Sequence, residues 1–358
     1  GCPSHLLEPE RLQKIQYSED FSQGYWAKFR ALITSNQAIS PEGSLNSDFL
    51  FENDILGTHL ITLSGAITSG VYTMSVFVKS KERTKIGLAN DSTSDSDIAK
   101  FDLSNGTIIS NGLHSAKIEE YENGWYRCSI TSTTSTPIRI MLLNSLGNSS
   151  YTGNGTSGIY IFGAQLEEGS YPTSYIPNYG TSAGITRSAD TANGAGNAST
   201  FNDSEGVLMA EISAKDDGAN KFITLSDGTD DNRVTIYFYT SINNDIRFQV
   251  RSNNINQPLT PMPSGYNIDE FNKIAIKYKQ NDISVYINGF LVVSNVGNID
   301  TPLNLSELAF DDGQGASDFY GNTKQLQYFD SALNDSDLEK LTSWTSFTAM
   351  ANGQSYTI

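Results

Sequence analysis

Cysteine and histidine are scarce in this chain. Only two cysteines and three histidines occur among 358 residues. Cys2 and Cys128 lie far apart, and Cys128 falls in an alternating, strand-like pattern, which predicts a buried free thiol at Cys128 in place of a disulfide. His5, His59 and His114 share no spacing with Cys, Asp or Glu that is typical of a metal site or of a nucleophile's base. We therefore expect these histidines at the surface or in turns.

Positive charge and long apolar runs are limited as well. Lys and Arg number 23 against 40 Asp and Glu, which gives a formal net charge of −17. The resulting field repels phosphate backbones and anionic lipids, so nucleic acid is not an expected partner. A glycan ligand is expected to be neutral or bridged by a metal ion, unless a local basic patch intervenes. No apolar run is long enough to span a bilayer, so membrane insertion is not expected either.

The residues that are abundant favour strands over helices. The chain contains 18 Tyr, 17 Phe and 30 Gly, while charged residues make up 18% of it. Its length is comfortable for two domains, since domains usually run to about 100–200 residues. Neither half alternates strands with helices, which excludes parallel-sheet architectures. The predicted fold class is all-β, with two tandem antiparallel β-sandwich (jelly-roll) domains and one short C-terminal helix.

Alternation of apolar and polar residues marks the strands of the first half. In residues 71–79, Tyr72, Met74 and Val76 fall on one face, with Thr73 and Ser75 on the other. This pattern predicts a half-buried strand. Further strands of the first domain are predicted at residues 125–131, 138–143 and 157–166.

Residues 181–200 are mostly Gly, Ser, Thr, Ala and Asn, with Ile185 as their only large apolar side chain. Such a segment cannot bury a core of its own, so we interpret it as a linker between a first domain at 1–180 and a second at 201–345. Residues 346–358 are predicted to form a C-terminal tail. Strands of the second domain are predicted at residues 206–214, 222–225, 233–240, 245–251, 271–279, 283–293, 307–311 and 322–329.

Two local signals in the second domain are strong. Asn288-Gly289 separates two apolar runs, which predicts a tight hairpin because both residues tolerate positive φ angles. Asn334 precedes an apolar stripe that includes Leu338, and Asp337 stands three residues after it. This spacing predicts the start of a helix that is capped by Asn334.

One sheet face of the second domain is a candidate binding surface. Alternation places Tyr237, Tyr239, Arg247 and Gln249 outward on neighbouring strands, whereas the phenylalanines between them point inward. Aromatic rings stack on the apolar face of a sugar while amide and charged groups bind its hydroxyls. The pattern therefore predicts a glycan-binding patch.

Two acidic loops offer a candidate metal site. Asp227 begins one loop, and Asp311 and Asp312 begin the other. Calcium prefers several oxygen ligands from such loops. The alternative is that Asp and Gly simply form tight turns there. The remaining carboxylates are scattered in loops typical of solvated turns, with no pair placed for glycan hydrolysis, so we do not expect an enzyme.

Long, distinctive stretches occur in both halves of the chain. In the first half they include Gly1-Cys2-Pro3-Ser4, Tyr17-Ser18-Glu19-Asp20-Phe21-Ser22, Asn123-Gly124-Trp125-Tyr126-Arg127 and residues 158–177. In the second half they include Leu225-Ser226-Asp227-Gly228, Phe271-Asn272-Lys273-Ile274-Ala275 and Leu308-Ala309-Phe310-Asp311-Asp312-Gly313. The first set resembles a carbohydrate-binding-like jelly-roll module of phage tail and tail-fibre proteins. The second is similar to the laminin-G-like, concanavalin-type domain that often follows it.

This resemblance implies a setting more firmly than a ligand. It implies a non-enzymatic virion protein of a tail fibre, spike or appendage, located in the virion or outside the cell, that binds a host-surface glycan or other virion proteins. Analogy with tail fibres suggests a homotrimer, although no heptad repeat supports one. The alternative is an accessory carbohydrate-binding region of a secreted polysaccharide-degrading enzyme or adhesin. Because the chain begins with Gly, we interpret it as a piece of a longer polypeptide.

Overall fold

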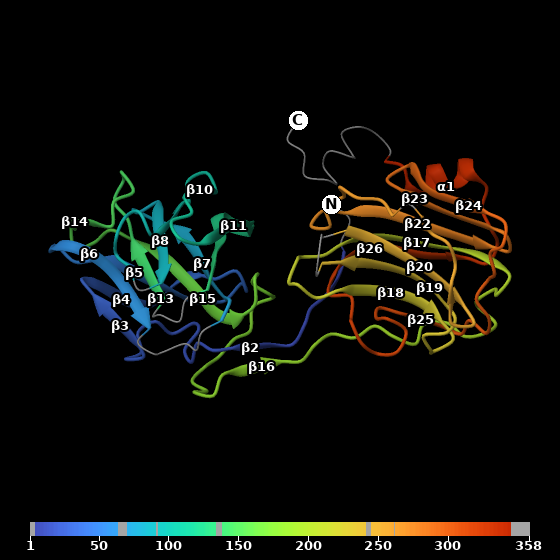
Figure 1. Cartoon of the computed structure of the whole chain (residues 1–358). Coiled ribbons are helices and arrows are strands. Elements are labelled where there is room, and N and C mark those ends of the chain that lie inside the picture. The colour runs from blue at the N-terminus through green and yellow to red at the C-terminus, as the bar shows by residue number, and fades with distance from the viewer. Residues whose placement is uncertain are drawn as a thin grey trace. The chain divides into compact units, whose positions relative to one another are not determined.

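The computed structural model describes residues 4–63, 70–90, 92–133, 138–240, 245–260 and 262–344. It divides the chain into two compact units. Residues Glu10–Ser188 form what we call the N-terminal unit, and Gly1–Pro9 together with Ala189–Ile358 form the C-terminal unit. The chain therefore starts in the C-terminal unit, passes through the whole N-terminal unit and returns. Both units are β-rich (Figure 1).

The N-terminal unit is a β-sandwich. One sheet has the order β10-β9-β8-β13-β6-β14 with β3 also paired to β6, the other has the order β11-β12-β7-β15-β5-β4, and β16 pairs with β2 alone. Its strands are β2 (Arg11–Gln13), β3 (Trp26–Phe29), β4 (Ala31–Ile39), β5 (Leu45–Glu52), β6 (Leu56–Leu63), β7 (Tyr72–Ser80), β8 (Lys85–Asn90), β9 (Ala99–Asp102), β10 (Thr107–Ser110), β11 (Ser115–Tyr121), β12 (Trp125–Ser132), β13 (Ile138–Leu142), β14 (Ser150–Thr152), β15 (Gly158–Glu168) and β16 (Ile185–Arg187), with a short 3₁₀ turn at Glu122–Gly124.

The C-terminal unit is a second β-sandwich. Its sheets have the orders β1-β26-β17-β22-β23-β24 and β21-β20-β19-β18-β25. Its elements are β1 (His5–Leu7), β17 (Glu205–Ser213), β18 (Lys221–Ser226), β19 (Arg233–Tyr239), β20 (Asp245–Ser252), β21 (Ile255–Asn256), β22 (Asn272–Lys279), β23 (Asp282–Ile287), β24 (Phe290–Val296), β25 (Glu307–Ala309), β26 (Gly321–Phe329) and helix α1 (Asp335–Thr342).

Each sandwich has its own apolar core between its two sheets. In the N-terminal unit, Ile61 and Ile140 from one sheet meet Val76 from the other, and all three are fully buried. In the C-terminal unit, Ile276 faces Phe238 in the same way. Neighbouring strands of both units pair antiparallel, as in β7 with β12 and β17 with β22. The predicted all-β, double-sandwich class is confirmed.

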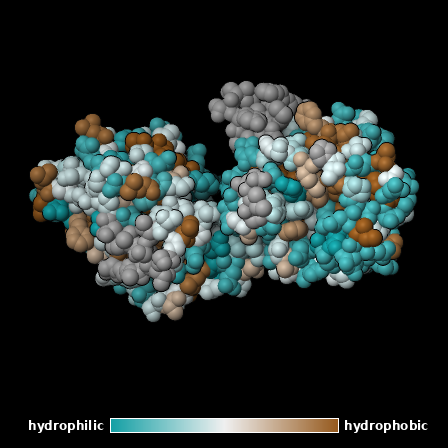
Figure 2. Space-filling view, viewed as in Figure 1, coloured by the Kyte–Doolittle hydropathy of each residue, from teal (hydrophilic) through white to brown (hydrophobic). Residues whose placement is uncertain are grey.

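The face of the molecule shown in Figure 2 is mixed in character. Figure 2 shows apolar residues in small groups over both units, with polar residues between them. This distribution is normal for a folded protein surface and does not by itself mark an interface. Among the described residues, no helix is long and apolar enough to cross a membrane.

The predicted strand at residues 71–79 forms as β7, but it is not half-buried. Both faces are covered from Tyr72 to Val78. One face belongs to the core, and Phe77 on the other packs with Trp125 and Phe162 in a separate aromatic cluster. Alternation of residue type does not reveal that this outer face is covered, because some of its residues are polar. Ser75 is one of them, and it is buried there with its hydroxyl accepting hydrogen bonds from Arg127.

The predicted linker at 181–200 is also different in the structure. Ile185 begins β16, which pairs with β2 in the N-terminal unit. Further along, Ala195 exchanges backbone hydrogen bonds with Leu308 of β25, and Phe310 donates to the carbonyl of Ala192. The change of unit falls between Ser188 and Ala189. The composition of this segment predicts correctly that it has no apolar core of its own. It does not predict the backbone hydrogen bonds, which form at a sheet edge without any apolar side chain.

The two strong local predictions are confirmed. Asn288 and Gly289 both have positive φ angles, 51° and 87°, in the turn between β23 and β24. The side chain of Asn334 accepts a hydrogen bond from the backbone N–H of Asp337 at 3.0 Å, which caps α1. Leu338 is buried against β17, β22 and β23 residues. Cys128 is a buried free thiol, as predicted, while Cys2 and the predicted tail at 346–358 lie outside the described residues.

The stretch at residues 158–177 that carries part of the family resemblance has a structural role. Glu167, fully buried on β15, accepts hydrogen bonds from the backbone N–H and hydroxyl of Thr173, both at 2.6 Å. Gln165 accepts the backbone N–H of Ile176 at 2.7 Å. The side chain of Gln13 donates to the carbonyls of Ala164 and Ile176. These buried polar groups fix the segment after β15 onto the N-terminal segment.

Candidate functional site

Two segments far apart in the sequence meet beside β4 and β5 in the N-terminal unit. The backbone N–H of Ser18 donates to the carbonyl of Asn178 at 3.0 Å, and the N–H of Asn178 donates to the Ser18 hydroxyl at 2.8 Å. Tyr17 and Tyr179 form an isolated antiparallel bridge next to this contact. The pairing therefore brings Tyr17 and Tyr179 next to each other.

Asp48 on β5 fixes the neighbouring strand and the N-terminal segment. Its carboxylate accepts the backbone N–H of Phe21 at 2.9 Å and that of Asn36 at 3.1 Å. Asn36 has a φ of 59° where the register of β4 against β5 shifts. Asp48 is only 2% exposed. Burial raises its pKa to about 6, against the hydrogen bonds from Phe21 and Asn36, and the nearby charge of Asp20 acts in the same direction as burial.

Two further carboxylates lie at the same place, and each is held by side chains. Glu19 accepts a hydrogen bond from the Asn46 side chain at 3.2 Å and one from the Tyr175 hydroxyl at 3.1 Å. Asp20 accepts one from the Gln23 side chain at 2.7 Å. These contacts fix the direction of both carboxylates.

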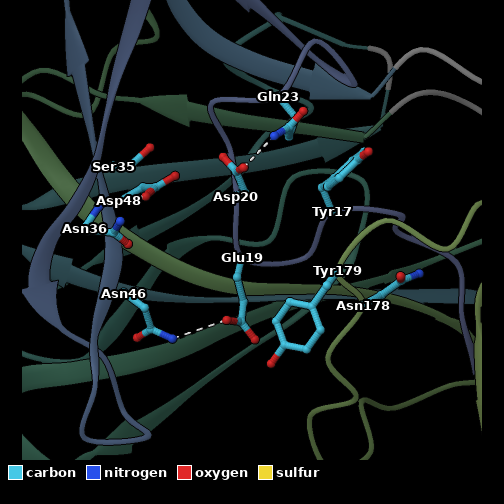
Figure 3. A pocket seen from close by; sticks show the side chains of 10 residues that line it. All are labelled: Tyr17, Glu19, Asp20, Gln23, Ser35, Asn36, Asn46, Asp48, Asn178 and Tyr179. Atoms are coloured by element: carbon cyan, nitrogen blue, oxygen red, sulfur yellow. Dashed lines mark hydrogen bonds between the residues drawn. The ribbon is translucent and has the colours of Figure 1, made fainter.

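These groups line a pocket of about 350 Å³, which we call the Tyr179 pocket (Figure 3). Its lining residues are Tyr17, Glu19, Asp20, Gln23, Ser35, Asn36, Asn46, Asp48, Asn178 and Tyr179. Figure 3 shows the carboxylates of Glu19, Asp20 and Asp48 around one space, with Tyr17 and Tyr179 on the side away from Asp48. The pocket is thus a polar hollow with an aromatic wall.

Tyr179 is the exposed member of that wall. It is 72% exposed, which is more than any other tyrosine among the described residues. Partial burial and the nearby Glu19 carboxylate raise the pKa of Tyr179, so it remains a neutral phenol at physiological pH. A ring of this kind offers an open face for stacking, while the amides and carboxylates around it accept and donate hydrogen bonds.

The predicted binding surface on the C-terminal unit has the predicted orientation. Tyr237 lies opposite Arg247 in the pairing of β19 with β20, and Gln249 lies two residues further along the same face. Phe238 and Phe248 point into the core and are buried. Alternation therefore gave the correct face for all of the predicted surface residues.

The same side chains already contact one another. The rings of Tyr237 and Phe222 stack with centroids 4.7 Å apart at an angle of 4°. The Arg247 guanidinium lies 5.5 Å from the centre of the Tyr239 ring and pairs with Asp245 at 3.0 Å. Gln249 accepts a hydrogen bond from Arg233 at 2.7 Å. Asp245 is buried, and the rings and the other polar groups of this face are half-buried in these contacts. Ligand binding here stays a prediction.

The acidic loops of the predicted calcium site are joined by an arginine. The Arg233 guanidinium donates to the backbone carbonyl of Asp312 at 2.8 Å and pairs with Asp230 at 2.6 Å. Asp227 accepts hydrogen bonds from Thr229 at 2.9 Å and 2.6 Å within its own turn. The carboxylates of Asp311 and Asp312 likewise accept backbone N–H groups of their own loop, those of Gly313 and Gln314.

Metal binding at these loops stays a prediction. Burial raises the pKa of Asp311, with the charges of Asp312 and Asp318 acting in the same direction. Among the described residues, no group of three or more His, Cys, Asp or Glu side chains is arranged to hold a metal ion.

The expectation that the histidines lie at the surface or in turns is wrong for His59. This residue is fully buried on β6. Its Nδ1 lies 2.7 Å from the carbonyl oxygen of Arg30, and its Nε2 lies 3.2 Å from that of Tyr151. Paired with two backbone carbonyls, His59 is a structural residue. His5 is exposed and His114 is half-buried in a turn, as expected.

Sequence reasoning missed the Tyr179 pocket. Its residues come from four separate stretches, and those of the loops between β2 and β3 and after β15 have no periodicity. A signal was nevertheless present, because Tyr17-Ser18-Glu19-Asp20-Phe21-Ser22 and the residues just before Asn178 carry the family resemblance. The strand pairing brings these two stretches together.

Comparisons with known proteins define similarity of fold only. No family model matches the sequence, and no curated protein matches it. Among solved structures, the chain is similar to CBM40 of the Ruminococcus gnavus IT-sialidase bound to α2,3-sialyllactose, at 15% identity and a TM-score of 0.34 over 42% of this chain and 94% of that one. It is similar to domains LG4-5 of the mouse laminin α1 chain, at 9% identity and a TM-score of 0.29 over 79% and 90%.

A third similar structure is the Trypanosoma rangeli sialidase in complex with sialic acid, at 10% identity and a TM-score of 0.30 over 83% of this chain and 60% of that one. Identities and TM-scores this low leave the function to be inferred from this chain's own residues.

Proposed function

We propose that this chain is a non-enzymatic binding protein that holds a neutral oligosaccharide in the Tyr179 pocket. The observation that carries the proposal is the exposed Tyr179 ring standing over a hollow lined by amide and carboxylate groups. One ring stacks on the apolar face of a pyranose, and the fixed polar groups of Glu19, Asp20 and Asn46 bind its hydroxyls.

The charge of the pocket favours a neutral sugar. Three carboxylates line it, and the chain as a whole carries a formal charge of −17. A negatively charged sugar would meet repulsion both at long range and at contact. Neutral hydroxyl groups instead donate to carboxylate oxygens, and such hydrogen bonds to charged acceptors are stronger than neutral ones.

An enzyme is the competing hypothesis, because three carboxylates converge on one space. Asp48 with a pKa of about 6 would suit a general acid. However, its carboxylate accepts two backbone N–H groups and is almost entirely buried, which fits a structural role at the β4 bulge. Glu19 and Asp20 are likewise held by neighbouring side chains. We therefore favour binding without catalysis.

The setting that we propose is a phage tail fibre, spike or appendage, where the chain binds a host-surface glycan. The sequence resemblance of both units to tail-protein modules supports this setting. An accessory region of a secreted polysaccharide-degrading enzyme or adhesin uses the same pocket equally well. Mass spectrometry of purified particles from the strain that encodes the chain distinguishes the two, since a tail component is found in the particles. Light scattering on the chain tests the predicted homotrimer.

The pocket is tested by screening the full chain on an array of neutral oligosaccharides, followed by calorimetric titration with the best ligand. Tyr179→Ala is expected to weaken binding at least tenfold, because it removes the stacking ring. Tyr121→Ala is the matched control, since Tyr121 is also exposed, at 39%, but lies outside the pocket. Equal affinity of the wild type and Tyr179→Ala contradicts the proposal.

The same titration mixtures test catalysis. A reducing-end assay on the bound oligosaccharide is expected to show no new ends over a day. Product formation that is lost in Asp48→Asn or Glu19→Gln would establish a glycoside hydrolase in place of a binding protein.

A further inference from the structure

Arg30 occupies an unusual place in the N-terminal unit. It is the single residue between β3, which pairs with β6 in one sheet, and β4, which pairs with β5 in the other. The chain changes sheets at this residue, and Arg30 has a φ of 52°. Positive φ at a residue with a long side chain is strained, because the Cβ atom approaches the following carbonyl.

Arg30 is the only residue with a long side chain that has a positive φ in the part of the chain that the structure describes. Among the described residues, every other non-glycine residue with positive φ is Asn or Ser. These are Asn36, Asn123, Asn253, Asn254, Asn281, Asn288, Asn298, Asn304 and Ser317. Asn tolerates the left-handed region best after Gly. An arginine at the sheet corner is therefore an exception, and such exceptions cluster at functional sites.

Surrounding groups hold the strained backbone in place. The carbonyl oxygen of Arg30 accepts the backbone N–H of Asn53 at 3.0 Å and lies 2.7 Å from Nδ1 of the buried His59. The side chain extends over Gly57, where an added Cβ would lie 2.7 Å from Nε of Arg30. The absence of a side chain at Gly57 thus leaves room for the guanidinium.

The Arg30 guanidinium has no ion pair or hydrogen bond with any described residue. Each other arginine is engaged, for example Arg83 with Glu52 and Arg127 with Ser75. Since the chain has 40 acidic residues, an unpaired guanidinium is not explained by a lack of carboxylates. A guanidinium presents a planar fork of donors that matches a carboxylate in two parallel hydrogen bonds.

Arg30 lines a groove of about 420 Å³ on the outer face of the β6 sheet. Phe29 lines it from β3, Arg139 lines it from β13, and β6 contributes Thr58, Leu60 and Thr62. Phe29 lies opposite Leu60 in the strand pairing and is 52% exposed. An exposed ring next to a cationic fork and hydroxyl groups suits a sugar that carries an acidic group.

We propose that this groove is a second carbohydrate site, which binds the carboxylate of an acidic sugar through Arg30. Phe29 stacks on the sugar ring while the guanidinium holds the carboxylate in a bidentate contact. The site is the local basic patch that an acidic glycan needs on a protein of net charge −17. It stands independently of the Tyr179 pocket, which takes a neutral ligand.

The decisive variant is Arg30→Asn in the full chain. Asn removes the guanidinium but suits the positive φ, so the melting temperature is expected to stay within about 3 °C of the wild type or to rise. The probes are 3′-sialyllactose and a galacturonic acid trisaccharide, with lactose as the neutral control. Calorimetric titration in a Tyr179→Ala background, which removes the proposed neutral-sugar site, is expected to show that at least one acidic probe binds more tightly than lactose and that adding Arg30→Asn lowers that affinity at least tenfold.

Three further measurements make the test specific. Phe29→Ala is expected to lose severalfold in affinity for the same probe, Arg30→Lys is expected to retain part of it, and added salt is expected to weaken wild-type binding. Tyr179→Ala is expected to leave acidic-sugar binding unchanged. Binding of neither acidic probe by the wild type, or equal binding by Arg30→Asn, overturns the proposal. A large fall in stability of Arg30→Asn assigns the arginine a structural role and overturns it as well.

Discussion

The Tyr179 pocket on the N-terminal unit and the β19–β20 face on the C-terminal unit both carry tyrosines, and they differ in how exposed those side chains are. Tyr179 is 72% exposed beside a pocket. The polar side chains around it are held by hydrogen bonds to residues other than Tyr179, which leaves its ring open. Tyr237 is half-buried and stacked on Phe222, and Arg247 beside it is paired with Asp245. Both surfaces have the composition of a sugar-binding site. Only the first presents an open aromatic face.

This difference concerns what a residue pattern can reveal. Alternation along β19 and β20 correctly predicted which way the side chains point. Alternation does not show whether an outward ring is free to contact a ligand. A neighbouring ring on the next strand can pack against it instead, as cross-strand aromatic pairs do in many sheets. Variants of Tyr237 and Tyr179 distinguish a structural surface from a binding one.

The largest effect is expected for Tyr237→Ala. Removing this ring leaves Phe222 without its stacking partner and opens a gap between β18 and β20, so the C-terminal unit is expected to lose about 2 kcal/mol of unfolding free energy. Calorimetric melting followed by a denaturant titration measures the loss. Oligosaccharide affinity is expected to stay unchanged. A stable Tyr237→Ala variant that no longer binds glycan would reverse the comparison and vindicate the prediction from sequence.

The pH dependence of the N-terminal unit is expected to report Asp48. Burial raises its pKa from 3.8 to about 6. Because the folded pKa lies above the unfolded one, the protonated form favours the folded state. The stabilisation is complete below about pH 4 and is lost as the pH rises through 6, which lowers the unfolding free energy by about 2 kcal/mol. Trp26 and Trp125 are buried in this unit, so urea titrations followed by fluorescence in a Trp344→Phe background report its unfolding.

Asp48→Asn is the matching variant for this pH dependence. It is expected to flatten the decline in unfolding free energy between about pH 5 and 7, since the amide does not titrate there. Burial also raises the pKa of Glu42, so the difference between wild type and variant is the quantity to compare. Burial of Glu52 is outweighed by the hydrogen bonds from Arg83 and Tyr151, which lower its pKa. Glu52 therefore titrates below its ordinary pKa and does not contribute to the slope between about pH 5 and 7. Identical pH profiles would assign the slope to other groups.

A small effect is expected for Tyr179→Phe. The ring that stacks on the sugar is retained, and only the hydroxyl near Glu19 is lost. Affinity for the neutral oligosaccharide is expected to fall no more than about threefold, which corresponds to roughly 0.6 kcal/mol. If titration shows a loss as large as that of Tyr179→Ala, the hydroxyl and not the ring face is the binding group of the pocket.

The smallest effect is expected from calcium. Arg233 already joins the two acidic loops, and the Asp227 carboxylate accepts hydrogen bonds within its own turn. Adding millimolar calcium or a chelator is expected to move the melting temperature of the C-terminal unit by less than about 1 °C. A rise of several degrees with calcium, lost in Asp311→Asn, would instead place a metal at these loops.

Much of the architecture was predictable because it rests on local physics. The all-β class follows from composition, the turn at Asn288-Gly289 from the tolerance of both residues for positive φ, and the start of α1 from the cap at Asn334. These features need only a few neighbouring residues. The strands of residues 4–63 were not predicted. For β4 the reason is that most of its positions are exposed and it lacks a regular apolar face.

The pocket was not predictable, for a different reason. Ser18 and Asn178 are 160 positions apart, and their hydrogen bonds decide where Tyr179 stands. Polar residues in loops look alike in sequence whether they face solvent or one another. The same holds at residues 181–200, where the backbone of Ala195 pairs with Leu308 and the side chains give no sign of it.

The position of β1 determines how the C-terminal unit can be expressed as a separate fragment. β1 pairs with β26, His5 opposite Thr323, although all of Glu10–Ser188 separates it from the rest of its sheet. The N-terminal sandwich is therefore an insertion within the other one, and the chain crosses between them at two points. A fragment that starts at residue 189 or 201 leaves the outer edge of β26 without its partner strand. Exposed edges recruit strands from other chains, so such a fragment is expected to self-associate unless residues 4–9 are supplied as a peptide.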